Sequence, residues 1–289
     1  MIQEVKPYNS YCLTDTHLQS SLDKRSCVLK ILHAIQSVWN ECKYLVMVAY
    51  YRYVASIPQL RSKSVTWNPD SQGLIVFIHG LRNDPAAWFS QLSLLPPNTK
   101  MDIFAPVVHK RGVCPLDQAV NPLLPKIEDY VKKNPKKPVC LLGTSNGSRV
   151  AAEIETRLRE ISPGTPVKVS SVAGPHLGSS SLDLFDRFSC GLANWRYPDG
   201  LKEELKYNSD KAKELLRRIK TPLPKGCAPR SYEFYATTED ITIPDLVSTL
   251  PKLTMREKHY LVHGESHGSI VSAIAKQQMD SCFAWMNSV

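Results

Sequence analysis

The sequence predicts an α/β protein in which a mostly parallel sheet of about six strands is flanked by helices. Two observations support this prediction: short apolar runs rich in β-branched residues recur along the chain, and amphipathic helical patterns lie between several of them. Strands that alternate with helices form crossover units, which build parallel sheets covered on both faces. The composition, with 43% hydrophobic and 22% charged residues, is typical of a folded globular protein.

The first part of the chain, residues 1–72, is expected to be a helical N-terminal extension. Apolar residues recur at helical spacing from Cys27 to Ile57, and Pro58 ends the pattern. Its most apolar stretch is interrupted by Arg52, whereas a membrane-spanning helix needs about 20 mostly apolar residues. From residue 73 the pattern changes, so we expect the α/β domain to occupy residues 73–289.

The expected strands of this domain are short apolar runs, as is typical of strands buried on both faces of a parallel sheet. They are Leu74–Ile78, Ile103–Val108, Val139–Leu142, Val167–Val172, Tyr232–Ala236 and His259–Val262. The interval between the fourth and fifth strands is too long for a simple crossover. We therefore interpret residues 179–230 as a lid-like insertion above the strand ends. A last helix is expected from about Ser269 to Met286.

The strongest chemical signal is the pentapeptide Gly143–Gly147, with the sequence GTSNG, between an apolar strand and an amphipathic helix. A serine on such a tight strand-to-helix turn is held in strained backbone geometry at the carboxyl edge of the sheet. The flanking glycines are needed because side chains there would collide with the neighbouring strand and helix. This setting indicates that Ser145 is a nucleophile.

With this motif and the pair His79-Gly80 at the end of an earlier strand, residues 73–289 resemble the α/β-hydrolase family, and within it the compact bacterial lipases and esterases. The resemblance implies an oxyanion hole formed by the backbone N–H groups of Leu81 and Asn146. It also implies that His79 and Gly80 support this hole from behind.

The family's order along the chain, nucleophile, then acid, then histidine, implies the other catalytic residues. The resemblance places the acid at Asp240, in the loop after the strand Tyr232–Ala236, with Glu239 and Asp245 as alternatives. For the base it favours His267, just before the last helix, over His263. A serine hydroxyl needs such a base, itself oriented by a carboxylate.

A further turn, Gly174-Pro175-His176-Leu177-Gly178, resembles the Pro-His-x-Gly turn of lipase-like members. The resemblance implies that His176 shapes the pocket without transferring protons. A purely structural turn held by glycine and proline remains the alternative.

The resulting prediction is a serine hydrolase of carboxylic esters, a lipase or esterase of lipid metabolism that acts on lipid-like or small-molecule esters. Such chemistry requires no metal ion and no cofactor. An acyl thioesterase would use the same triad. The alternative from another class is a catalytically silent hydrolase-fold binding module, because a fold does not by itself establish an activity.

The charge gives a last expectation. With 36 Lys and Arg against 27 Asp and Glu, the net charge of +9 favours peripheral contact with an anionic membrane. No nucleic acid partner is expected, since the sequence contains no recognisable nucleic-acid-binding module. The beginning of the sequence lacks the pattern of a signal peptide, so a cytoplasmic location is expected, with peripheral membrane association. The eight cysteines form no CxxC pair, which argues against zinc-ribbon and thioredoxin-like functions.

Overall fold

A sheet with the strand order β1-β7-β6-β5-β4-β2-β3 forms the centre of the protein. The computed structural model describes residues 2–5, 23–54, 67–181, 197–253 and 257–289. The strands are β1 (Ile2–Val5), β2 (Gly73–Ile78), β3 (Met101–Phe104), β4 (Val139–Thr144), β5 (Val167–Val172), β6 (Arg230–Thr237) and β7 (Glu257–Val262). β2 to β7 run parallel to one another, and β1 pairs with β7 in the antiparallel direction.

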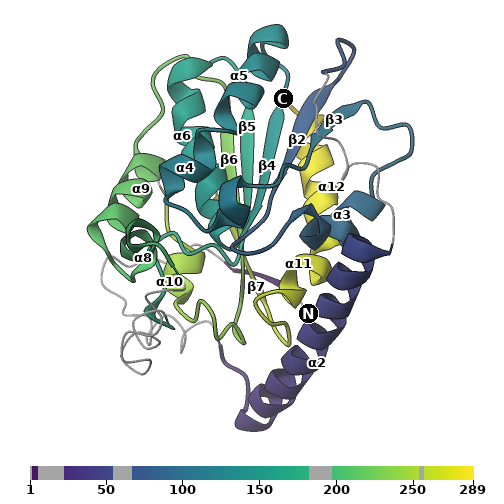
Figure 1. Cartoon of the computed structure of the whole chain (residues 1–289), viewed down its shortest axis with the longest axis vertical. Coiled ribbons are helices and arrows are strands. Elements are labelled where there is room, and N and C mark those ends of the chain that lie inside the picture. The colour runs from purple at the N-terminus through teal and green to yellow at the C-terminus, as the bar shows by residue number, and fades with distance from the viewer. Residues whose placement is uncertain (1, 6–22, 55–66, 182–196, 254–256) are drawn as a thin grey trace.

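Helices cover both faces of this sheet (Figure 1). On one face lie α4 (Leu116–Val120), α5 (Leu124–Lys133), α6 (Asn146–Ile161), α9 (Asp210–Lys220) and α10 (Leu246–Thr249). On the other face lie α2 (Cys27–Tyr53), the short 3-10 helix η2 (Pro85–Trp88), α3 (Phe89–Ser93), α11 (Ser269–Ala273) and α12 (Ala275–Met286). A second 3-10 helix, η3 (His109–Gly112), and α8 (Asp199–Leu205) complete the described helices.

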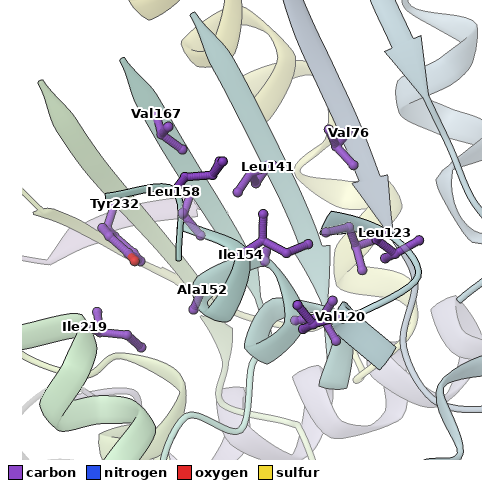
Figure 2. Close-up of a cluster of buried hydrophobic side chains, with 14 of the residues drawn as sticks. Val76, Val120, Leu123, Leu141, Ala152, Ile154, Leu158, Val167, Ile219 and Tyr232 are labelled. Carbon is purple, nitrogen blue, oxygen red and sulfur yellow. The ribbon is translucent and has the colours of Figure 1, made fainter. Parts of the chain in front are cut away.

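Along β2 to β7, side chains on opposite faces of the sheet belong to two separate hydrophobic cores. In β2, Val76 points to the core beneath α6, whereas Phe77 points to the core beneath α12. Figure 2 shows the first core, in which Ile154 of α6 packs against Leu141 of β4. Because strand side chains alternate between faces, runs that are apolar at every position require a sheet buried on both sides. The predicted fold class and the predicted parallel sheet are therefore confirmed.

The helix predicted from about Ser269 to Met286 is divided into α11 and α12. Two details of the sheet also differ from the sequence prediction. The strand expected at Ile103–Val108 is β3, which lies at Met101–Phe104. Pro106 has no N–H to donate, so pairing does not continue through the predicted second half. The strand β1 was not predicted, since four residues in a region of helical character carry no clear periodicity. It lengthens the sheet by pairing Ile2 with Val262.

The helix predicted in the N-terminal extension is present as α2, which Ser26 caps by accepting a hydrogen bond from the N–H of Leu29. α2 packs on α11 and η2, where Tyr44 and Val48 are buried. Most of the apolar residues that define its pattern nevertheless face away from the protein. Among the described residues, no helix has the length and apolar character that crossing a membrane requires.

The interval interpreted as an insertion, residues 179–230, contains α8 and α9. The amphipathic pattern of Asp210–Lys220 forms α9, whose N-cap Ser209 accepts a hydrogen bond from the N–H of Ala212. Its apolar side, including Leu215 and Ile219, packs into the first core. Residues 182–196 of the interval lie outside the described residues.

Replacing Glu155 with alanine is expected to destabilise the fold strongly. Its fully buried carboxylate binds the guanidinium of Arg159 at 2.7 Å, lies 3.1 Å from that of Arg230, and accepts a hydrogen bond from the hydroxyl of Tyr232 at 2.7 Å. Removing one partner from such a cluster leaves buried cations uncompensated, which costs about 3–5 kcal/mol. Chemical denaturation would measure the loss of unfolding free energy. Glu160→Ala, on the exposed side of the same helix, should change it by less than about 0.5 kcal/mol.

Candidate active site

The turn between β4 and α6 holds Ser145 with φ 53° and ψ −129°, a conformation that costs a non-glycine residue about 1–3 kcal/mol. Glycines make the turn feasible. A Cβ atom on Gly147 would lie 2.2 Å from the carbonyl oxygen of Ile78, and one on Gly143 would lie 2.5 Å from the carbonyl oxygen of Gly147. The hydroxyl of Ser148 donates to the Gly143 carbonyl at 2.8 Å and so ties the helix back to the strand.

The loop after β2 lies directly against this serine. A Cβ atom on Gly80 would be 2.7 Å from the Cβ of Ser145, so only glycine fits there. His79 is buried, accepts a hydrogen bond at Nε2 from the N–H of Val108 and donates from Nδ1 to the carbonyl of Gly80. Burial lowers the pKa of His79 to about 4, so the ring is neutral at pH 7. His79 therefore ties the loop after β2 to Val108.

The two expected oxyanion donors border the same short segment. Asn146 is the first residue of α6, where backbone N–H groups have no acceptor within the helix. Its side chain donates to the carbonyl of Gly112 at 3.4 Å and accepts from Arg149 at 3.1 Å. A Cβ atom on Gly112 would lie 3.6 Å from the Cα of Leu81. Leu81 and the side chain of Asn146 thus both lie close to Gly112.

The side chains of Asp240 and His267 are hydrogen-bonded, with 2.7 Å between Oδ2 and Nδ1. The other oxygen of Asp240 accepts from the backbone N–H groups of Thr242 and Ile243, each at 2.8 Å. Burial acts to lower the pKa of His267, but the charge of Asp240, the hydrogen bond to it and the charge of Glu41 together raise the pKa above its ordinary value. With Nδ1–H donating to the carboxylate, Nε2 can accept a proton.

The alternative acid and base residues have other partners. Glu239 pairs with Arg25 at 2.6 Å and accepts from the N–H of Gly264 at 2.8 Å. Asp245 accepts from the N–H and hydroxyl of Ser180 at 2.7 and 2.8 Å. His263 shares a hydrogen bond of 3.0 Å with Thr238 and stacks on the ring of His33. Of the pairs considered from the sequence, the structure joins Asp240 with His267.

The strand directions explain why these groups lie at one edge of the sheet. Ser145 follows β4, Asp240 follows β6 and His267 follows β7, and all three strands are parallel. The carboxyl ends of parallel strands meet at the same edge. Among the hydrogen bonds between described residues, none joins the Ser145 hydroxyl to His267. Such bonds are often long in unliganded enzymes and shorten when substrate binds.

His176, in the loop after β5, lies next to Gly174, which contacts the first turn of α6. Its Nε2 shares a hydrogen bond of 2.8 Å with the Ser171 hydroxyl, and its ring packs edge-on against Phe234. Burial lowers its pKa to about 3, so the ring is neutral at pH 7. The preceding Gly174 packs against Ser148, since a Cβ atom there would lie 2.5 Å from the serine Cβ. His176 is therefore a fully buried, neutral ring packed against Ser171 and Phe234.

The polar contacts of α2 to the loops around the site were not predicted. The carboxylate of Glu41 accepts hydrogen bonds from the N–H groups of Gly268 and Ser269, each at 3.1 Å, and from the hydroxyl of Ser266. It therefore holds both sides of the residue that pairs with Asp240. The sequence does contain a signal, because Glu41 is the only acidic residue between Cys27 and Tyr53.

Other residues of the N-terminal region hold the neighbouring loops. Arg25 binds Glu239, next to Asp240, and also donates to the hydroxyl of Thr238 at 2.7 Å. Arg52 pairs with Asp84, in the loop after β2, at 2.5 Å. The region before residue 73 thus contacts the loops that carry the candidate oxyanion donor, acid and base.

A buried arginine was also missed by the sequence reading. Arg149, in the first turns of α6, is 1% exposed, and its guanidinium lies 3.6 Å from the carboxylate of Glu204 in α8. Glu204 accepts a hydrogen bond from the N–H of Leu116 at 2.8 Å. Because Arg149 also donates to Asn146, this pair connects the serine turn to the insertion.

A pocket of about 750 Å³ lies between α2 and the loops after β6 and β7. His267 and Thr238 line it from the loops, whereas Lys30, Val38 and Cys42 line it from α2. Ser145 is not among its lining residues. The pocket therefore reaches His267 from the side of the N-terminal helix. Within the described part of the chain, no group of three or more His, Cys, Asp and Glu side chains is placed to hold a metal ion.

Glu41→Gln is expected to move the acidic limb of any His267-dependent activity to lower pH. The variant keeps an oxygen acceptor for the loop N–H groups but removes a charge that raises the His267 pKa. A kcat/KM profile against pH would measure the shift. Asp70→Asn, an equal change of charge on exposed backbone before β2, at the opposite edge of the sheet, should leave the profile unchanged. An unshifted profile in Glu41→Gln would contradict the assigned positioning role.

The fold of this chain is similar to folds of known proteins. No family model matches the sequence, and no curated protein matches it. A chain from LipS and LipT, two metagenome-derived lipolytic enzymes, aligns with a TM-score of 0.52 and 11% identity over 81% of this chain and 100% of that chain. The mature Bacillus licheniformis lipase BlEst2 aligns with a TM-score of 0.52 and 15% identity over 78% of this chain and 96% of its own. The chain therefore has the α/β-hydrolase fold.

Proposed function

We propose that this protein is a serine hydrolase that cleaves carboxylic esters, with Ser145, His267 and Asp240 as its catalytic triad. The observation that carries the proposal is the hydrogen bond between Asp240 and His267 at the sheet edge where Ser145 is held in a strained turn. A carboxylate that fixes the tautomer of a histidine, at the sheet edge that also carries a serine on a strand-to-helix turn, is the arrangement that activates a serine hydroxyl.

In this mechanism His267 Nε2 takes the proton of the Ser145 hydroxyl while Oγ attacks the acyl carbonyl carbon. The carbonyl oxygen becomes an oxyanion, which the N–H groups of Leu81 and Asn146 stabilise. His267 then gives the proton to the departing alcohol, which leaves an acyl-serine. Water attacks this ester, His267 takes a proton from the water and returns it to Ser145, and the free acid departs.

Two observations favour lipid-like acyl esters as substrates. The pocket beside His267 is large enough for a ligand of moderate size and has apolar side chains such as Val38 and Ile241 in its wall. The net charge of +9 favours peripheral contact with anionic membranes, where such esters are presented. Small soluble esters and acyl thioesters would react by the same chemistry and are distinguished by experiment.

Ser145→Ala is expected to abolish labelling by a fluorophosphonate probe and to lower kcat by at least about 1,000-fold, because the nucleophile is removed. The control is Ser162→Ala, beyond the far end of α6, which should retain both properties. Labelling that persists in Ser145→Ala would contradict the proposed nucleophile. A wild-type protein that neither reacts with the probe nor hydrolyses esters would support a silent binding module instead.

The same pair of variants defines the substrate class. Hydrolysis rates would be measured on matched oxygen esters and thioesters of increasing acyl length. Rates that rise with acyl length on oxygen esters, and that depend on Ser145, are the expected result. A preference for thioesters would indicate a thioesterase, and activity confined to short acyl chains would contradict the lipid-like substrate.

The activity of the wild-type protein is expected to fall at acidic pH through a pKa above 6.5, the ordinary value for histidine. His267 must be neutral to accept a proton, and its pKa is raised, so the active form is present above that pKa and is lost as the pH falls through it. His267→Ala should remove the activity. His263→Ala should leave most of it, since His263 contacts Thr238 and His33 instead of Asp240. Full activity in His267→Ala would overturn the assignment of the base.

A further inference from the structure

The polarity of α2 is reversed relative to that of an ordinary surface helix, which buries its apolar stripe and exposes its polar side. Apolar side chains form a continuous stripe on the outward face of α2. This stripe consists of Val28, Leu32, Ile35, Trp39, Val46, Tyr50 and Tyr53, with exposed fractions of 47% to 78%. We refer to these seven residues as the outer stripe.

Polar contacts fix this orientation. The opposite side of α2 carries Asn40, Glu41 and Arg52, which bind the His267 loop and the loop after β2. Tyr44 and Val48 are buried between them. Turning the outer stripe inward would break these hydrogen bonds and ion pairs. The stripe therefore stays on the surface unless another body covers it.

The shape of the outer stripe limits what can cover it. A helix of 27 residues is about 40 Å long, and one face about 10 Å wide presents about 400 Å². Stable protein dimers bury about 800 Å² on each partner, twice this area. Figure 1 shows α2 along the side of the molecule, with its first turns extending beyond the sheet. A long, narrow apolar ridge on an outer edge fits a planar surface.

The charges around the outer stripe favour an anionic surface. Glu41, the only acidic residue of α2, is turned towards the His267 loop, and Lys30 pairs with Asp23 beside the pocket, whereas Lys43 is exposed next to the outer stripe. The ammonium of Lys43 lies 5.1 Å from the ring centroid of Trp39. Lysine beside tryptophan and aliphatic side chains is typical of helices that lie in the membrane interface with their apolar face inserted.

The outer stripe also borders the pocket beside His267. Val38, which is 66% exposed, and Cys42 line the pocket from α2. Val38 is three residues from Ile35, and Cys42 is three residues from Trp39 and four from Val46, so both adjoin the outer stripe on the helix surface. The pocket reaches His267 on its far side. A surface that covered the outer stripe would therefore lie at the mouth of the pocket.

From these observations we infer that α2 docks the protein on an anionic lipid membrane, with the outer stripe in the boundary between headgroups and acyl chains and the pocket beside His267 adjoining the bilayer. The docking surface itself does not depend on catalysis. Docking would let acyl chains enter the pocket from the membrane, and this role rests on the proposed hydrolase function.

The test is flotation of the full chain with lipid vesicles. Wild type is expected to bind phosphatidylcholine vesicles that contain about a third phosphatidylglycerol, to bind pure phosphatidylcholine far less, and to lose affinity as salt rises. The triple variant Ile35→Ser, Trp39→Ser and Val46→Ser should bind the anionic vesicles at least tenfold more weakly. Lys43→Gln should weaken binding about fivefold. Ile161→Ser, an exposed apolar residue at the end of α6, is the matched control and should bind as wild type.

Thermal unfolding and hydrolysis of a short soluble ester should be unchanged in the triple variant, because its three side chains are exposed and none lines the pocket. Wild-type protein that does not bind anionic vesicles, or a triple variant that binds as well as wild type, would overturn the proposal. A wild-type dimer in sedimentation that the triple variant disrupts, without vesicle binding, would assign the outer stripe to a second copy instead. Ser145→Ala should still float with vesicles, so a failure of the hydrolase proposal would be seen separately.

Discussion

The close approach of three backbone segments at Ser145 is the constraint on which the rest of the site depends. The end of β2, the turn after β4 and the first turn of α6 meet within van der Waals distance, and a Cβ atom on Gly80 or Gly147 would overlap its neighbours. This contact places the serine, the candidate oxyanion donors and the positive end of the α6 dipole together. It also accounts for the strained φ of Ser145, which surrounding packing maintains.

The N-terminal helix supplies a second, electrostatic constraint. Loops that follow parallel strands can take many conformations, so the distance between Asp240 and His267 is not determined by the sheet alone. Glu41 holds the backbone on either side of His267, and Arg25 holds Glu239 beside Asp240. A helix whose polar side is used for these contacts must place its apolar side elsewhere. The outer stripe is thus exposed because the polar side of α2 faces the loops and holds them in place.

Local sequence signals predicted most of the sheet and the candidate nucleophile because both depend on short-range patterns, whereas the family resemblance supplied the candidate acid and base. Apolar runs indicated the parallel strands, and a serine between glycines at a strand-to-helix junction indicated the nucleophile turn. The second predicted strand, Ile103–Val108, was wrong in its bounds because Pro106 ends the pairing, and β1 was missed because four residues are too few to show a period. The contacts of Glu41 and Arg149 join segments far apart in the chain, which spacing alone does not relate.

The sequence by itself determined the fold class, the order of the strands along the chain and the candidates Ser145, Asp240 and His267. The fold class, the strands and Ser145 follow from hydrophobic periodicity and motif context, which are local properties, whereas Asp240 and His267 follow from the resemblance to the α/β-hydrolase family. Only the tertiary structure decided that Asp240 pairs with His267, that Glu239 and His263 have other partners, and that α2 faces the site with its polar side. The physical reason is that amphipathicity shows that a helix has two sides, but the partners available in three dimensions decide which side is buried.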